Sequence, residues 1–120
     1  MRSLPRVLIV DESEESREIL RTLLERRGAT TIEAERPEQA VRLADLHQPD
    51  LIVLDAESDH SGTGAATDDL EAAARRRAVP IVILGTVRPR GGRPGSGQFV
   101  AKPYHYGQLI RKIDDLLDAA

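Results

Sequence analysis

The sequence predicts an α/β fold in which helices cover both faces of a parallel sheet. Residues 7–10 and 51–54 contain only Val, Ile and Leu, which is typical of strands buried on both faces. Segments with helical spacing of Leu, Ile and Ala alternate with such runs, as in βαβ architectures. Since the chain has 120 residues, we expect one domain over residues 1–120.

The first half of the chain contains signals for three strands and two helices. Ser13 is suited to cap the first helix, and Gly28 is suited to end it, because glycine readily adopts the left-handed conformation. Pro37 fits the first turn of the second helix. The predicted elements are a strand at 6–10, a helix at 13–28, a strand at 30–34, a helix at 37–48 and a strand at 50–55.

The second half predicts two further strands and two further helices. A helix capped by Thr67 runs to about Arg77, and Pro80 precedes the fourth strand, residues 81–84. Residues 86–97 contain two prolines and four glycines, so we expect a loop there in place of a crossover helix. The fifth strand is predicted at 98–101. The closing helix has an apolar stripe made of Leu109, Ile110, Ile113, Leu116 and Leu117.

Carboxylates follow two of the predicted buried strands. Asp11 and Glu12 come directly after the first strand, and Asp55 ends the third. Ligands of parallel sheets bind beyond the carboxyl ends of the strands, where strand order reverses. Three acids at one such place would repel one another, and a hard divalent cation such as Mg²⁺ would neutralise them.

Composition excludes several classes of protein. The net charge of −3 argues against direct nucleic-acid binding, for which a basic domain is usual. Cysteine is absent, which excludes disulfides and thiolate metal sites. No apolar run approaches membrane-spanning length, so we expect a cytoplasmic protein without a membrane partner.

Four groups of residues, in their order along the chain, carry a resemblance to a known family. They are Asp11-Glu12, Asp55, Pro80 and the segment Phe99-Val100-Ala101-Lys102-Pro103. With them the chain resembles the receiver domain of two-component response regulators. The resemblance implies a flavodoxin-like (βα)5 three-layer sandwich with strand order 2-1-3-4-5, here with a Gly-, Pro- and Arg-rich loop between strands four and five. It also implies a signalling module rather than an enzyme.

The same resemblance implies roles for the acids. Asp55 would be the phosphoacceptor, receiving a phosphoryl group from a histidine kinase or phosphotransfer protein. Mg²⁺ would be bound by Glu12 and Asp55 directly, by Asp11 through water and by the carbonyl of Glu57. A downstream protein, whose identity the sequence does not reveal, would read the signal, and a homodimer is one arrangement open to the chain.

Lys102 and Phe99 receive roles in the same way. The chain has 17 basic residues, and only Lys102 and Lys112 are lysine. A compact ammonium suits a tight anionic site better than a guanidinium fork, in keeping with the implied pairing of Lys102 with Asp55. The bond to Pro103 would be cis, and Phe99 would be the aromatic switch, although a strand interior also favours a bulky apolar residue without any switching.

The chain departs from the receiver pattern at several positions. Glu12 stands where aspartate is usual, and Gly85 occupies the position of the switch Ser or Thr. Either a bulge at Gly85 lets Thr86 supply that hydroxyl, or the hydroxyl is lost. The loop at 56–62 lacks the usual proline and adds carboxylates.

These departures leave a second function open. A pseudo-receiver would keep the fold as an interaction module that is not phosphorylated. A flavin- or nucleotide-binding enzyme is disfavoured, because Asp-Glu-Ser follows the first strand where a glycine-rich phosphate loop would be needed.

Overall fold

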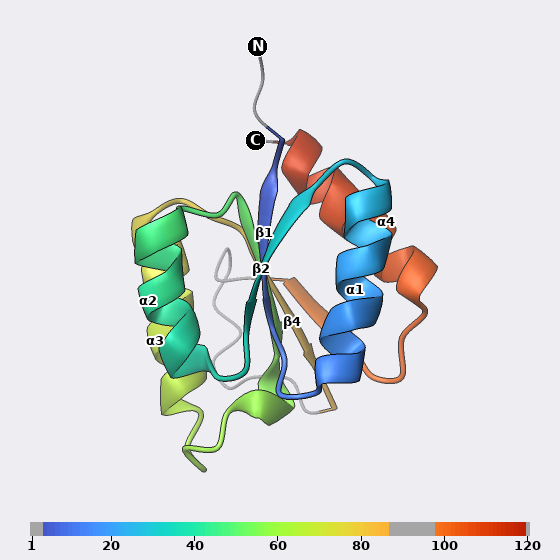
Figure 1. Ribbon diagram of the computed structural model, residues 1–120. Coiled ribbons are helices and arrows are strands. Elements are labelled where there is room, and N and C mark those ends of the chain that lie inside the picture. The colour runs from blue at the N-terminus through green and yellow to red at the C-terminus, as the bar shows by residue number, and fades with distance from the viewer. Residues whose placement is uncertain (1–3, 87–97, 120) are drawn as a thin grey trace.

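The computed structural model describes residues 4–86 and 98–119, which form a three-layer α/β sandwich (Figure 1). Five parallel strands lie in the order β2-β1-β3-β4-β5. Helices α1 and α4 cover one face of the sheet, and α2 and α3 cover the other. The elements are β1 (Arg6–Val10), α1 (Glu14–Arg26), β2 (Thr30–Ala34), α2 (Pro37–His47), β3 (Leu51–Asp55), the 3₁₀ turn η1 (Ala56–Ser58), α3 (Ala65–Arg76), β4 (Ile81–Gly85), β5 (Gln98–Ala101) and α4 (Tyr106–Asp118).

This architecture confirms the predicted fold class and strand order. The predicted loop lies, from residue 87 to residue 97, outside the described residues. In the described ranges, no helix is long and apolar enough to cross a membrane.

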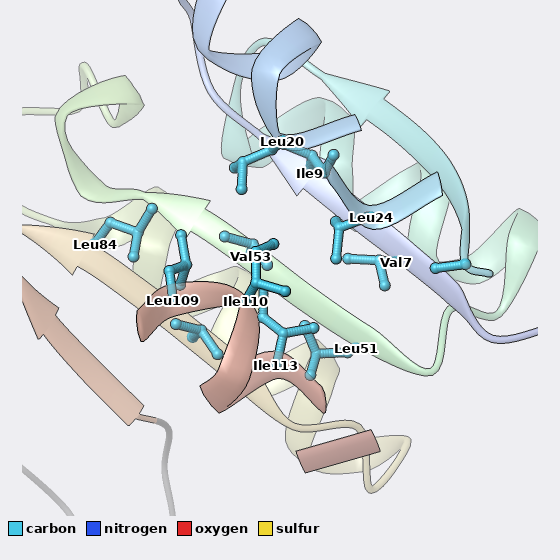
Figure 2. Packing of buried hydrophobic residues seen from close by; sticks show 12 residues of the cluster. Val7, Ile9, Leu20, Leu24, Leu51, Val53, Leu84, Leu109, Ile110 and Ile113 are labelled. Atoms are coloured by element: carbon cyan, nitrogen blue, oxygen red, sulfur yellow. The ribbon is translucent and has the colours of Figure 1, made fainter. Parts of the chain in front are cut away.

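Both faces of the sheet are packed with aliphatic side chains, which explains the uniformly apolar strands. On one face Val7, Ile9 and Val53 contact Leu20 and Leu24 of α1 together with α4 (Figure 2). The apolar stripe of α4 reaches this core through Leu109, Ile110 and Ile113. On the other face, α2 and α3 bring Ala40, Ala44, Leu70 and Ala74 onto the sheet. Small alanines let these two helices lie close to the strands.

Several predicted helix boundaries are confirmed by their local chemistry. The Ser13 side chain accepts a hydrogen bond from Ser16 N at the start of α1. Gly28 has φ +88°, the left-handed conformation that ends the helix region. Pro37 occupies the first turn of α2.

The predicted cap of α3 is wrong. The helix begins at Ala65, after Gly64, so Thr67 lies within the first turn. Its backbone N and its hydroxyl both donate to the Asp59 carboxylate, at 2.8 and 2.7 Å. A carboxylate from the preceding loop therefore satisfies the free N–H that a capping side chain normally serves.

Candidate functional site

Asp55 and Lys102 meet at the carboxyl edge of the sheet. Asp55 ends β3 and is only 6% exposed. Lys102 follows β5, and its Nζ lies 2.8 Å from Asp55 Oδ1. Burial alone would lower the pKa of Lys102, but the hydrogen bond and charge of Asp55, with the charges of Glu57 and Asp11, raise that pKa above its usual value. The ammonium is therefore held in its charged form beside the acid.

Asp11 is the second buried acid of this pocket. The residue is 5% exposed, and its carboxylate accepts a hydrogen bond from Ser13 N at 2.8 Å. Burial, together with the charge and hydrogen bond of the neighbouring Asp55, raises the pKa of Asp11 to about 6 against the opposing effects of Ser13 and Lys102. Among the described residues, the Lys102 ammonium thus faces two desolvated carboxylates.

Arg17 of α1 holds the backbone of Asp11 in place. Its NH1 donates to the carbonyl oxygen of Asp11 at 2.7 Å, and its Nε lies 3.0 Å from Glu33 Oε1 on β2. The helical periodicity of α1 does not predict this role of Arg17, because it reveals neither partner. A charged residue on the otherwise apolar face of α1, near Leu20 and Leu24, is the signal that was available.

Glu12, in contrast, turns away from the buried acids. Its Oε2 lies 2.8 Å from His60 Nε2 and 3.3 Å from Arg36 NH1. Its backbone N donates to Ser58 Oγ at 2.9 Å, so the main chain stays at the pocket rim while the side chain points to the neighbouring loops. The structure therefore does not group Glu12 with Asp11 and Asp55.

The loop after β3 brings a third carboxylate to Lys102. Glu57 Oε1 lies 3.5 Å from Lys102 Nζ, and Glu57 N donates to Asp55 Oδ1 at 3.2 Å. Next to it, Asp59 accepts hydrogen bonds from Ser61 and Thr67. Partial burial would raise the pKa of Asp59, but these hydrogen bonds outweigh it and lower the pKa to about 2.

The remaining predicted positions lie on β4 and β5 or directly after these strands. Gly85 pairs with Ala101 in regular register, and Lys102 N donates to Gly85 O, so the strand continues through Gly85 without the bulge that was considered. Thr86 follows directly and is exposed. Phe99 is half-buried on β5 against the α2–α3 side of the core. The Lys102–Pro103 peptide bond is cis, as the resemblance implied.

The buried acids fit a divalent cation only in part. Asp11 and Asp55 provide hard oxygen ligands at a buried position, which suits Mg²⁺. Within residues 4–86 and 98–119, however, no three acidic or imidazole side chains are arranged to hold one ion. The Glu12 carboxylate, which the resemblance implied as a ligand, is engaged by Arg36 and His60.

Comparison with known proteins identifies the class. A family model described as the response regulator receiver domain matches residues 7–114. The chain therefore belongs to this family, whose members are signalling modules of two-component systems.

Individual relatives agree with that assignment. The chain is similar to the protein PilH of Pseudomonas aeruginosa, with 29% identity covering 93% of this chain and 97% of PilH. It is 31% identical to the transcriptional regulatory protein PdtaR of Mycobacterium tuberculosis, covering 91% of this chain and 55% of that protein. It thus spans nearly all of PilH but about half of PdtaR.

A solved structure supports the fold. The chemotaxis protein CheY4 of Vibrio cholerae superposes with a TM-score of 0.76 over 95% of this chain and 99% of that one. At 19% identity this likeness concerns the fold alone.

Proposed function

We propose that this chain is a phosphoacceptor receiver in which Asp55 takes a phosphoryl group from a phosphohistidine of a histidine kinase or phosphotransfer protein. The observation that carries the proposal is the contact of Lys102 Nζ with Asp55 Oδ1 beside a second buried acid, Asp11. Phosphoryl transfer demands positioning and charge neutralisation more than covalent chemistry from the protein. A buried carboxylate that is fixed by an ammonium provides the positioning.

Two donors orient the Asp55 carboxylate for the transfer step. Lys102 Nζ and Glu57 N both donate to Oδ1 of Asp55, which fixes the plane of the carboxylate and so orients Oδ2. A carboxylate oxygen attacks phosphorus, a P–O bond forms, the P–N bond to the donor imidazole breaks, and that nitrogen recovers a proton from solvent. Lys102 remains beside the product and pairs with its phosphoryl oxygens.

A magnesium ion would be held by Asp11, Asp55 and the Glu57 carbonyl. When bound, it supplies positive charge to the phosphoryl oxygens and to the two acids. In the part of the chain that the structure describes, the Lys102 ammonium faces the buried pair and Glu57, so transfer is expected to depend on the ion. The phosphorylated state would then be read by a downstream protein.

A pseudo-receiver is the second candidate, and two observations favour it. Glu12 is paired with Arg36 and His60 rather than with the buried acids. Gly85, in regular register on β4, carries no hydroxyl at the position where receivers carry one. In this reading the fold would serve as a constitutive interaction module.

One experiment separates the two. The protein is incubated with Mg²⁺ and phosphoramidate, a small donor with a P–N bond, and its intact mass is measured. We expect a gain of one phosphoryl group in the wild type and none in Asp55→Asn or without Mg²⁺, whereas the exposed-acid variant Asp115→Asn should behave as wild type. An unmodified wild-type chain under these conditions would support the pseudo-receiver.

A further inference from the structure

The Glu12 carboxylate, at the rim of the pocket, contacts side chains of the neighbouring loops and not the buried acids. It is 42% exposed and contacts two cationic or donor groups from different loops. Arg36 stands between β2 and α2, and His60 lies in the loop between η1 and α3. Glu12 itself follows β1, so the contact joins three of the loops at this edge of the sheet.

Both partners of Glu12 are held by the segments around them. Arg36 NH1 also donates to the carbonyl of Glu35 at 3.2 Å. His60 follows Asp59, whose carboxylate is fixed by four hydrogen bonds from Ser61 and Thr67. The Glu12 backbone N donates to Ser58 Oγ, and three rotatable bonds separate that backbone from the carboxylate, so the carboxylate can leave this contact by side-chain rotation alone.

We propose that Arg36 and His60 form a latch that holds the Glu12 carboxylate outside the pocket, so that a divalent cation must compete with them for this ligand. Turning Glu12 inward without a cation would place a further negative charge beside Asp11, Asp55 and Glu57, which share one ammonium. Carboxylates gathered in one pocket repel one another when they all carry a negative charge. A bound cation removes this repulsion, and the latch then opposes binding.

Binding of the cation and closure of the latch use the same carboxylate and are thus coupled. By linkage, removing the latch should strengthen cation binding by the factor that the latch contributes. Exposed ion pairs of this kind change equilibrium constants by about two- to fivefold. The inference rests on the proposed function only in assuming that the pocket takes Mg²⁺.

The first test needs no metal. The chain has three histidines, and their imidazole signals can be followed by ¹H–¹³C NMR in EDTA at about pH 8, above the usual histidine pKa. Glu12→Ala should move the signals of His60 and leave those of His47 and His105 in place. Unchanged His60 signals would overturn the latch, whatever the pocket does with phosphoryl donors.

The second test measures Mg²⁺ dissociation constants by calorimetry in a cycle of four chains: wild type, Arg36→Ala/His60→Ala, Glu12→Ala and the triple variant. The latch predicts that removing Arg36 and His60 tightens Mg²⁺ binding about two- to fivefold when Glu12 is present. It predicts no change in the Glu12→Ala background. The pair Arg42→Ala/His47→Ala, on α2, removes the same residue types elsewhere and should leave the constant unchanged.

The outcomes distinguish this inference from the proposed function. Equal tightening in both backgrounds would mean a general charge effect and would overturn the latch, while the phosphoacceptor function stands. If no chain binds Mg²⁺ but Glu12→Ala moves the His60 signals, the contact of Glu12 with His60 stands, and both its competition with a cation and the magnesium-dependent function are overturned.

Discussion

Lys102 Nζ lies 2.8 Å from Asp55 Oδ1, although the two residues are 47 positions apart in sequence and their strands are separated by β4. The contact is possible because both residues stand at the carboxyl edge of the sheet. It is the direct link between the fold and the chemistry, since only this ammonium meets the Asp55 carboxylate among the ion pairs of the described residues.

Removing this ammonium should slow phosphoryl transfer. In Lys102→Ala the charge that faces the developing negative charge is lost, and we expect the rate of phosphorylation by phosphoramidate to fall about 10²-fold or more. Lys102→Arg keeps the charge but replaces a compact donor by a planar fork, so it should restore only part of the rate. Intact mass against time measures each rate.

The second lysine provides the matched control. Lys112 lies on α4, with its Nζ 3.4 Å from Gln98, and Lys112→Ala should react at the wild-type rate. A Lys102→Ala chain that keeps the wild-type rate, or a Lys112→Ala chain that loses it, would contradict the assigned role of Lys102.

Asp11 should lower the stability of the metal-free protein at alkaline pH. Because its pKa is raised from 3.8 to about 6 in the folded state, its contribution to stability is present below the unfolded pKa and is lost as pH rises through about 6. Asp11→Asn should therefore raise the free energy of unfolding at about pH 8, by at most about 3 kcal/mol. The gain should shrink as pH falls from about 6 to about 4.

Urea denaturation in EDTA across this pH range tests the expectation. Asp115→Asn, which changes an exposed acid of α4, should alter the free energy of unfolding by less than about 0.5 kcal/mol. A destabilised Asp11→Asn chain at alkaline pH would show that the Asp11 carboxylate is not under strain from desolvation.

The ionised Asp59 carboxylate should stabilise the fold at neutral pH, in contrast to that of Asp11. Its pKa is lowered to about 2 by hydrogen bonds, so its contribution to stability is present above the unfolded pKa of about 4 and is lost as pH falls toward 2. Asp59→Ala, which leaves the first turn of α3 without its acceptor, should cost about 1–2 kcal/mol at neutral pH.

The difference between wild type and Asp59→Ala should narrow as the pH of the denaturation series falls below about 4. Thr67→Ala removes one of the four hydrogen bonds and should cost less, about 0.5–1.5 kcal/mol. A pH-independent difference would argue that the Asp59 charge contributes nothing and that α3 is held by packing alone.

The sequence was sufficient for the fold and for part of the site. Asp11 and Asp55 each follow or end an apolar strand, which predicts that the two acids lie close together, because the carboxyl ends of parallel strands lie at the same edge of the sheet. The outward turn of Glu12 and the capping of α3 by Asp59 were not predicted. Both depend on which long-range partner a polar side chain selects, and periodicity carries no information about that choice. The predictions for Thr86 and Phe99 as functional residues stay predictions.

Arg17 should stabilise the fold by supporting the end of β1. Replacing it with methionine keeps an apolar stem of similar length but removes the donor to the Asp11 carbonyl. Glu33 would still be paired with Arg21, whose NH1 lies 3.1 Å from Glu33 Oε2. The main loss is therefore the hydrogen bond to a buried backbone acceptor, and we expect the free energy of unfolding to fall by about 1–3 kcal/mol. Arg26→Met, at an exposed position of the same helix, should change stability by less than about 0.5 kcal/mol. Equal effects of the two substitutions in urea denaturation would show that Arg17 serves only as an ordinary helix residue.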